Sequence, residues 1–183
     1  MLIRREHPSD HDAIAEVHRA AFASVAPPGR GPVEPGLVDA LRAGSGGAGA
    51  STASAWLPPL SLVAENSSGS VVGHVCASRA DLSGEPVLAL GPIGVVPDRW
   101  RTGIGSALMH AVLGAADALD ESVIVLLGHL GYYPRFGFVP AAELGITVDV
   151  PEWGSHLQAR ALTAYRPDLR GEFRYAAPFY EIP

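Results

Sequence analysis

Residues 95–113 read VVPDRWRTGIGSALMHAVL, and this stretch decides the fold. It begins with the apolar end of a strand, continues through two arginines, Gly103 and Gly105, and enters a helical pattern. Apolar residues in that pattern recur at spacings of four, four, four and three, which places them on one helical face. They are Ile104, Leu108, Val112, Ala116 and Leu119. The stretch therefore predicts a strand, a glycine loop and a helix in direct succession.

The glycine loop has the chemistry of an anion site. The first turn of a helix leaves about four backbone N–H groups without partners, and these groups carry a positive partial charge. Glycines let a phosphate approach the backbone closely, and Arg99 and Arg101 add charge. A tight turn whose glycines only ease packing is the alternative. The usual nucleotide motifs do not fit, because the chain has no lysine for a P-loop and Leu108 replaces the third glycine of a dinucleotide fingerprint.

Composition predicts one soluble domain, residues 1–183. The chain is 48% hydrophobic and 17% charged, which is enough apolar material for a real core. Its net charge of -6 argues against nucleic acid as a partner. No apolar run approaches the roughly 18 residues of a membrane span, and the charged N-terminus does not resemble a signal peptide. The single cysteine, Cys76, fits a reducing compartment, so we expect a cytoplasmic protein without a membrane partner.

Hydrophobic patterns along the chain predict alternating strands and helices. The order of these elements favours a single α/β or α+β layered domain on a central sheet. Residues 45–54 are low in complexity and are expected to form a loop, and residues 66–69 a turn. The expected strands are 2–6, 60–65, 70–82, 86–96, 122–128 and 171–182, and the expected helices are 8–24, 34–44 and the one that follows Gly103.

Two segments give the chain a family resemblance. Residues 90–108, LGPIGVVPDRWRTGIGSAL, resemble the central motif of the GCN5-related N-acetyltransferases (GNAT). Residues 125–138, VLLGHLGYYPRFGF, are similar to a subgroup of predicted acetyltransferases with a GH…YYxRFGF segment, and the tail GEFRYAAPFYEI also fits it. The resemblance implies a mixed central sheet with helices on both faces and splayed central strands. Trp100 stands where the family has Gln or Arg, so Arg99 or Arg101 is expected to supply the missing polar support.

The resemblance also implies a cosubstrate, acetyl-coenzyme A (acetyl-CoA). No metal is expected, because His7 and His11 lie around a helix start without a third ligand. The cosubstrate would lie where strands 87–95 and 122–128 splay apart, with its pantetheine arm on the first strand, its pyrophosphate on the glycine loop and its nucleotide near Arg135. The implied binding residues are Ile93, Gly94, Val95, Arg101, Thr102, Gly103, Ile104, Gly105, Ser106 and Arg135.

Direct acetyl transfer to a primary amine needs an acid for the thiolate and a base for the amine. Tyr133 matches the family's tyrosine, and a phenol with a pKa of about 10 stays protonated at neutral pH. Its alternative is a packed aromatic. His129 is the expected base, with His74 as a second candidate; a hydrogen-bonded core histidine is the alternative for each. Cys76 has no recognisable activating partner.

Two functions follow from these residues. The first is an N-acetyltransferase acting on the amine of a small molecule or a protein. The second is a catalytically weak acyl-CoA-binding or regulatory module, which the substitution at Trp100 and the lack of an obvious base keep open. A homodimer is one option for the assembly.

Overall fold

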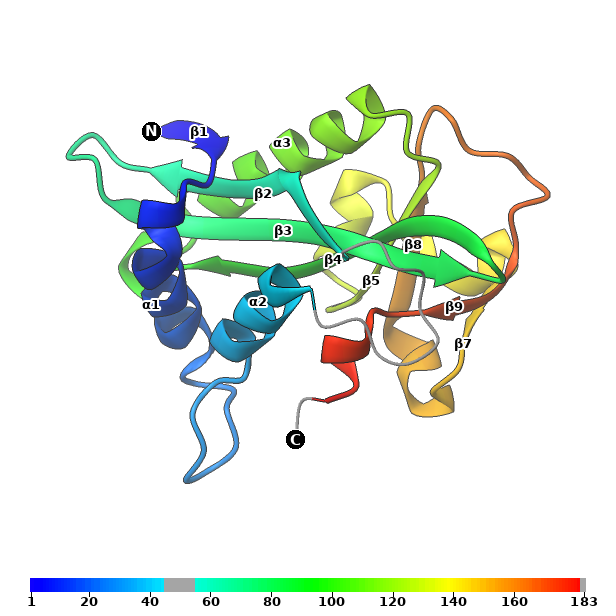
Figure 1. Ribbon diagram of the computed structural model, residues 1–183, viewed down its shortest axis with the longest axis horizontal. Helices are drawn as coiled ribbons and strands as arrows, with labels where there is room; N and C mark the ends of the chain where they lie inside the picture. Colours follow the sequence, from blue (N-terminus) through cyan, green and yellow to red (C-terminus); the bar gives the residue numbers. More distant parts are fainter. Residues whose placement is uncertain (45–54, 182–183) are drawn as a thin grey trace.

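The computed structural model of the chain describes residues 1–44 and 55–181, so the predicted loop 45–54 lies outside the described residues. Within them, nine strands form one mixed sheet in the order β1-β2-β3-β4-β5-β8-β6, with β9 paired to β3 and β7 paired to β9 (Figure 1). The strands are β1 (Leu2–Arg5), β2 (Trp56–Glu65), β3 (Val71–Leu82), β4 (Glu85–Val95), β5 (Val123–Leu127), β6 (Val139–Pro140), β7 (Ile146–Val148), β8 (Leu157–Ala161) and β9 (Gly171–Arg174). The α-helices are α1 (His11–Phe22), α2 (Glu34–Ala43) and α3 (Ile104–Ala118).

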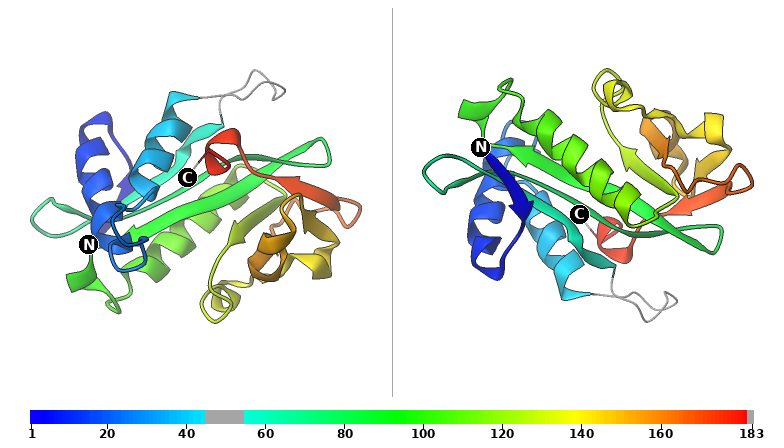
Figure 2. Two further views of the ribbon diagram at one scale, coloured as in Figure 1. Left: turned by 90° about the horizontal axis from the view of Figure 1, so that it is seen from below. Right: turned by 90° about the horizontal axis from the view of Figure 1, so that it is seen from above.

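The helices cover both faces of the sheet, as the family resemblance implies. Helix α3 lies on one face and α1 and α2 lie on the other (Figure 2). The apolar face of α3 fills the larger core, although Leu119, predicted on that face, follows the end of the helix and is exposed. A second core lies around β5, β7, β8 and β9. None of the described helices is long and apolar enough to cross a membrane.

Strand β5 has the continuously apolar sequence Val-Ile-Val-Leu-Leu because both of its faces are buried. Ile124 and Leu126 face the core under α3, whereas Val123 and Val125 face the second core. A strand buried on both faces has no polar position, so the predicted buried strand at 122–128 is confirmed as β5.

The β3–β4 hairpin is closed by the two-residue turn Ser83–Gly84. Leu82 pairs with Glu85 on either side of the turn, and the φ angles of Ser83 and Gly84 are 51° and 93°. Positive φ at both positions is typical of the tight turn that matches the twist of an antiparallel pair. The hairpin fixes β4 at the centre of the sheet.

Some predicted elements differ from the structure. The helix expected at 8–24 is a short 3₁₀ turn, Pro8–Asp10, followed by α1. The expected tail strand 171–182 ends at Arg174 and gives way to a 3₁₀ turn at Ala177–Phe179, where Pro178 has no backbone N–H for a ladder. Strands β6, β7 and β8 were not predicted, because they have two, three and five residues and are too short for a periodic signal.

The central strands β4 and β5 separate after a short parallel contact. Their register contains only Leu88↔Ile124 and Ala89↔Val125. Beyond Ala89, β4 continues to Val95 along β3, while β5 ends at Leu127. The splayed central strands that the resemblance implies are therefore present, and no strand among the described residues pairs with the β5-facing edge of residues 90–95.

Candidate active site

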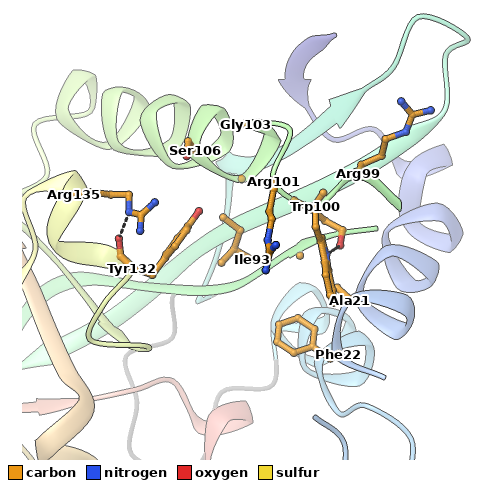
Figure 3. A pocket seen from close by; sticks show the side chains of 13 residues that line it. Ala21, Phe22, Ile93, Arg99, Trp100, Arg101, Gly103, Ser106, Tyr132 and Arg135 are labelled. Atoms are coloured by element: carbon orange, nitrogen blue, oxygen red, sulfur yellow. Dashed lines mark hydrogen bonds between the residues drawn. The ribbon is translucent and has the colours of Figure 1, made fainter. Parts of the chain in front are cut away.

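A cleft of about 670 Å³ opens at the end of the splayed strands. Its walls come from β4, the loop that leads into α3, the first turn of α3, the end of α1 and the segment after β5 (Figure 3). The lining residues are Ala21, Phe22, Ile93, Gly94, Val95, Arg99, Trp100, Arg101, Gly103, Gly105, Ser106, Tyr132 and Arg135. Its volume is within the range of small-molecule sites.

The glycine loop turns the chain from β4 into α3 and leaves the helix start open. Gly103 is the residue before the helix and has a φ of 89°, a left-handed conformation that glycine adopts without strain. The first helical hydrogen bond of α3 runs from Ala107 N–H to the Gly103 carbonyl, at 3.0 Å. The preceding N–H groups of the first turn therefore have no helical partner, and the cleft lies against them.

Space at Gly105 is limited. A Cβ atom there would lie 3.0 Å from the hydroxyl oxygen of Tyr132, which reaches toward the start of α3 from the segment after β5. Glycine at this position keeps the helix start bare where the cleft passes it.

Three arginines make the cleft strongly cationic. Arg99, Arg101 and Arg135 line it, and none of its described lining residues is acidic. The Arg135 guanidinium stacks over the Tyr132 ring at 4.8 Å and donates from Nε to the Tyr132 carbonyl at 2.9 Å. A helix start with unpartnered N–H groups and three guanidinium groups suits a ligand with phosphate groups.

Trp100 supplies polar support that the sequence did not lead us to expect from it. Its indole N–H donates to the carbonyl of Val95 at 2.6 Å, which fixes the loop to the end of β4. Its ring is 49% exposed and lies beside Ala21 and Phe22 (Figure 3). The interpretation that the Trp100 side chain offers no polar support at this position is therefore wrong.

Residues 43–138 match the family described as the acetyltransferase (GNAT) family, which is more than half of the chain. The chain belongs to the GNAT acetyltransferase family. The mixed sheet with helices on both faces and the splay between β4 and β5 agree with this assignment.

Individual GNAT proteins resemble the chain over most of its length. The GNAT family N-acetyltransferase YhbS from Escherichia coli, solved with CoA, has a TM-score of 0.83 at 26% identity and covers 100% of this chain and 93% of its own. A GNAT acetyltransferase from Brucella melitensis, solved with acetyl-CoA, has a TM-score of 0.73 at 34% identity and covers 97% of both chains. The uncharacterized N-acetyltransferase YjhQ from Escherichia coli K12 is 33% identical over 129 residues, which is 66% of this chain and 71% of YjhQ.

Most of the positions implied by the GNAT resemblance lie together in the cleft. The lining includes Ile93, Gly94, Val95, Arg101, Gly103, Gly105, Ser106 and Arg135. Two others do not line it. Thr102 is exposed and its hydroxyl donates to the Arg99 carbonyl at 2.6 Å, while the Ile104 side chain is buried in the core under α3.

Sequence reasoning missed the α1 side of the cleft and Tyr132. Ala21 and Phe22 read only as apolar helix positions, and nothing in their pattern indicates a cleft. Tyr132 lines the cleft and carries the stacked Arg135. Arg135, three residues after Tyr132, is the one sequence feature that could have indicated this role.

Tyr133 lies behind this lining. Its ring packs edge-on against Tyr132 and Phe138, and a Cβ atom on Gly128 would lie 2.2 Å from its Cε2, so it sits against the end of β5. Burial, followed by the neighbouring Tyr132, raises the pKa of Tyr133 to about 12. At neutral pH the phenol is protonated and can donate.

His129 is exposed and does not line the cleft. It follows β5, and its Nδ1 accepts a hydrogen bond from the Gly131 N–H at 3.2 Å. In a neutral ring the proton then sits on Nε2, so neither nitrogen offers a free lone pair in this arrangement. The role of His129 as a base stays a prediction.

His74, the second base candidate, is fully buried and bonded at both ring nitrogens. Nε2 lies 2.9 Å from Ser61 Oγ and Nδ1 lies 2.8 Å from His18 Nε2. Cys76 is also buried, and burial raises the pKa of its thiol, which argues against a thiolate nucleophile. Among the described residues, no group of three His, Cys, Asp or Glu side chains could hold a metal.

Proposed function

We propose that the protein transfers the acetyl group of acetyl-CoA directly to a primary amine of a small molecule or a protein. The observation that carries the proposal is the cationic cleft at the point where β4 leaves β5. Two GNAT proteins that resemble the chain over most of its length were solved with CoA and acetyl-CoA, which supports the same ligand here.

The chemistry of the cleft residues fits this cosubstrate. The open edge of β4 at Ile93, Gly94 and Val95 offers backbone groups to the amides of the pantetheine arm. The bare first turn of α3, with Arg101 nearby, would hold the pyrophosphate, and Arg135 is placed for a further phosphate of the nucleotide. CoA carries several negative charges, so a cleft whose described lining has three arginines and no acidic residue favours it over a neutral ligand.

The proposed reaction forms a C–N bond and breaks the C–S bond of the thioester. The amine attacks the acetyl carbonyl and loses one proton to His129 or to solvent. The departing thiolate takes one proton from the Tyr133 hydroxyl, which the GNAT resemblance implies as the acid although Tyr133 lies behind the cleft lining, and solvent then reprotonates Tyr133. The raised pKa of Tyr133 keeps this proton available across the neutral range. A backbone N–H on the open edge of β4 would stabilise the oxyanion; one such donor is typically worth about 2.7–4 kcal/mol of barrier.

His129 is kept in the proposal as the base because it follows β5, the second of the two splayed strands. To accept a proton, its ring must give up the hydrogen bond from the Gly131 N–H. His129→Asn separates this role from solvent catalysis: a base of this kind should lower the rate by about 10²–10⁴-fold, and an unchanged rate assigns amine deprotonation to solvent.

The test is an acetyl-CoA assay with a panel of small amines and peptide amines, read by release of the CoA thiol. Amine-dependent thiol release, with acetylated product identified by mass, supports an acetyltransferase. Tight CoA binding without release for any amine supports the alternative, an acyl-CoA-binding module. An unpaired, buried Cys76 is consistent with the cytoplasm as the place of action.

A further inference from the structure

A buried network of side-chain hydrogen bonds crosses the sheet face that α1 and α2 cover, and no step of the proposed reaction uses it. It links Glu6, Ser61 in β2, His74 in β3 and His18 in α1. Ser61 Oγ lies 2.6 Å from Glu6 Oε2, His74 Nε2 lies 2.9 Å from Ser61 Oγ, and His18 Nε2 lies 2.8 Å from His74 Nδ1. Ser61, His74 and His18 are all fully buried, so solvent cannot replace any of these bonds.

The carboxylate of Glu6, at one end of the network, determines which atom carries the proton in each of its hydrogen bonds. Glu6 can only accept, so Ser61 donates its single hydroxyl proton to it and accepts from the Nε2–H of His74. Neutral His74 then has its lone pair on Nδ1, which requires a proton on Nε2 of His18. The remaining atom, His18 Nδ1, is an acceptor without a hydrogen-bond partner among the described residues.

This unpartnered atom lies directly behind the wall of the cleft. A Cβ atom on Gly94 would lie 2.9 Å from His18 Nδ1 and 3.3 Å from Ala21 Cβ, so α1 approaches β4 as closely as a glycine allows. Ala21 and Phe22 follow His18 by one helical turn and line the cleft, and the His18 ring stacks with Phe22 at 6.0 Å. The His18–His74 hydrogen bond therefore ties the wall residues to the sheet.

We propose that the hydrogen-bond network of Glu6, Ser61, His74 and His18 positions the α1 wall of the cleft against β4. Protonation of this network releases the wall. His18 and His74 are positioning residues in this proposal. Its consequence for cosubstrate affinity rests on the proposed function; the positioning itself does not.

The network cannot accept an extra proton without losing a hydrogen bond. A second proton on His18 places a charged N–H at Nδ1, where no described acceptor is in reach. A second proton on His74 sets two N–H groups against each other at the His18 contact. Both outcomes leave buried donors unpaired, so protonation requires α1 to move away from the sheet.

The surrounding charges do not remove this sensitivity. Arg42 of α2 donates to both oxygens of Glu6, at 3.0 and 2.9 Å, and so offsets the carboxylate that would attract a proton to His74. Asp10 is held by Arg4, His11 lies 3.5 Å from Glu6 at the outer end, and β4 contributes only the uncharged Gly94.

Burial lowers the pKa of both histidines, although Glu6 opposes this for His74. When α1 moves away, His18 regains the ordinary pKa of about 6.5, and His74 is freed of much of its burial while Glu6, 3.4 Å from its Nε2, still favours the protonated ring. The docked arrangement is therefore stable above that pH and loses stability as the pH falls below it.

The test is hydrogen exchange of the α1 amides in the ligand-free protein at pH 7.5 and pH 5.5, corrected for intrinsic exchange. Each histidine that is neutral when docked and ordinary when released should raise the opening equilibrium about tenfold at pH 5.5, so protection should fall about 100-fold. His18→Gln keeps an amide donor for His74 Nδ1 but cannot titrate, so its loss of protection should be only about tenfold. The exposed His156→Gln is the matched control and should behave as the wild type.

A CoA titration at pH 7.5 supplies the second arm. His18→Ala should weaken CoA binding and raise the KM for acetyl-CoA about fivefold, the equivalent of one buried hydrogen bond, with kcat unchanged; His18→Gln should restore both within about twofold. A wild type whose α1 protection does not change between the two pH values overturns the proposal, as does a 100-fold loss in His18→Gln. A wild type that binds no CoA contradicts the proposed function instead, because the exchange arm uses no ligand.

Discussion

The two sides of β4 handle polar groups in opposite ways. On the side of the cleft, three exposed arginines and the bare start of α3 face solvent, and the described lining holds no acidic residue, although Asp98 outside it lies 3.5 Å from Arg99. On the side of α1, every donor in the network of Glu6, Ser61, His74 and His18 has a partner inside the protein, and one acceptor, His18 Nδ1, has none among the described residues. The difference shows that an exposed cation costs little without a partner, whereas a buried polar group has to be satisfied one bond at a time. One strand therefore separates an exposed, arginine-lined cleft from a buried network in which each donor has a partner.

The largest expected effect concerns Tyr133, which belongs to neither side and tests whether the cleft is catalytic at all. Tyr133→Phe keeps the ring but removes the proton, so turnover should fall by about 10²–10⁴-fold while CoA affinity and melting temperature change little. The measurement is steady-state kinetics with isothermal titration of CoA. Tyr132→Phe is the control and should retain most of its turnover; equal rates for the two variants would make Tyr133 only a packed aromatic.

The next largest effect breaks the buried side. Glu6→Gln removes both hydrogen bonds from Arg42 to the Glu6 carboxylate and leaves Arg42, whose side chain is 11% exposed, with the exposed Asp39 as its carboxylate partner. It should lower the free energy of unfolding by about 3 kcal/mol. For Glu6, burial alone would raise the pKa, but the hydrogen bonds from His74, Arg42 and Ser61 lower it overall. Its contribution is therefore present above the ordinary pKa near 4.5 and is lost as the pH falls below it.

Urea unfolding at pH 7 and at pH 4 measures both parts of this prediction, and the wild type should lose more stability than Glu6→Gln between the two. Glu16→Gln, on the exposed part of α1, should match the wild type at both pH values. A Glu6→Gln protein as stable as the wild type at pH 7 would show that the Glu6 carboxylate does not stabilise the buried network.

A smaller effect is expected on the cleft side at Gly105. Gly105→Val crowds the Tyr132 hydroxyl and covers the start of α3, so CoA affinity should fall roughly 100-fold, the equivalent of two weakened hydrogen bonds to phosphate. Titration calorimetry measures the affinity. Gly114→Val is a matched change in the same helix at an exposed position where a Cβ meets nothing within 4 Å, and it should bind as the wild type does. Unchanged affinity in a folded Gly105→Val protein would place the ligand elsewhere.

The smallest effect belongs to Trp100, at the junction of loop and strand. Trp100→Phe removes the indole N–H that reaches the Val95 carbonyl, a bond worth about 1 kcal/mol, so CoA affinity should fall about fivefold. Fluorescence titration with the remaining tryptophans measures it. A change below twofold would mean that the loop keeps its shape without this bond.

The sequence predicted the parts of the fold whose residues carry a pattern long enough to read. The four-residue repeat of α3 and the apolar run of β5 are of this kind. Strand β8 escaped because Leu-Gln-Ala-Arg-Ala alternates over only five residues, too few to identify a strand. The folded structure buries Gln158, whose amide donates to the Gly128 carbonyl at 3.1 Å.

The cleft was predictable where a local motif marks it and not where distant segments meet. Gly103 and Gly105 are visible in the sequence, but the contribution of Ala21 and Phe22 depends on how α1 packs against β4. His18 left a signal that went unused. It follows Ile14 by four residues and precedes Ala21 by three, so it lies on the apolar face of α1, where a histidine must find a buried partner.

The short contact between β4 and β5 has a consequence for aggregation. Residues 90–95 present a strand edge that β5 does not cover, and such an edge is a template on which another chain can add a strand. Pro92 lies in the middle of this edge and has no N–H, so it interrupts the regular row of donors that an incoming strand would need. Gly91 and Gly94 further reduce the side-chain surface available for cross-strand packing. The opening between the strands can therefore admit a flexible ligand while resisting a second polypeptide.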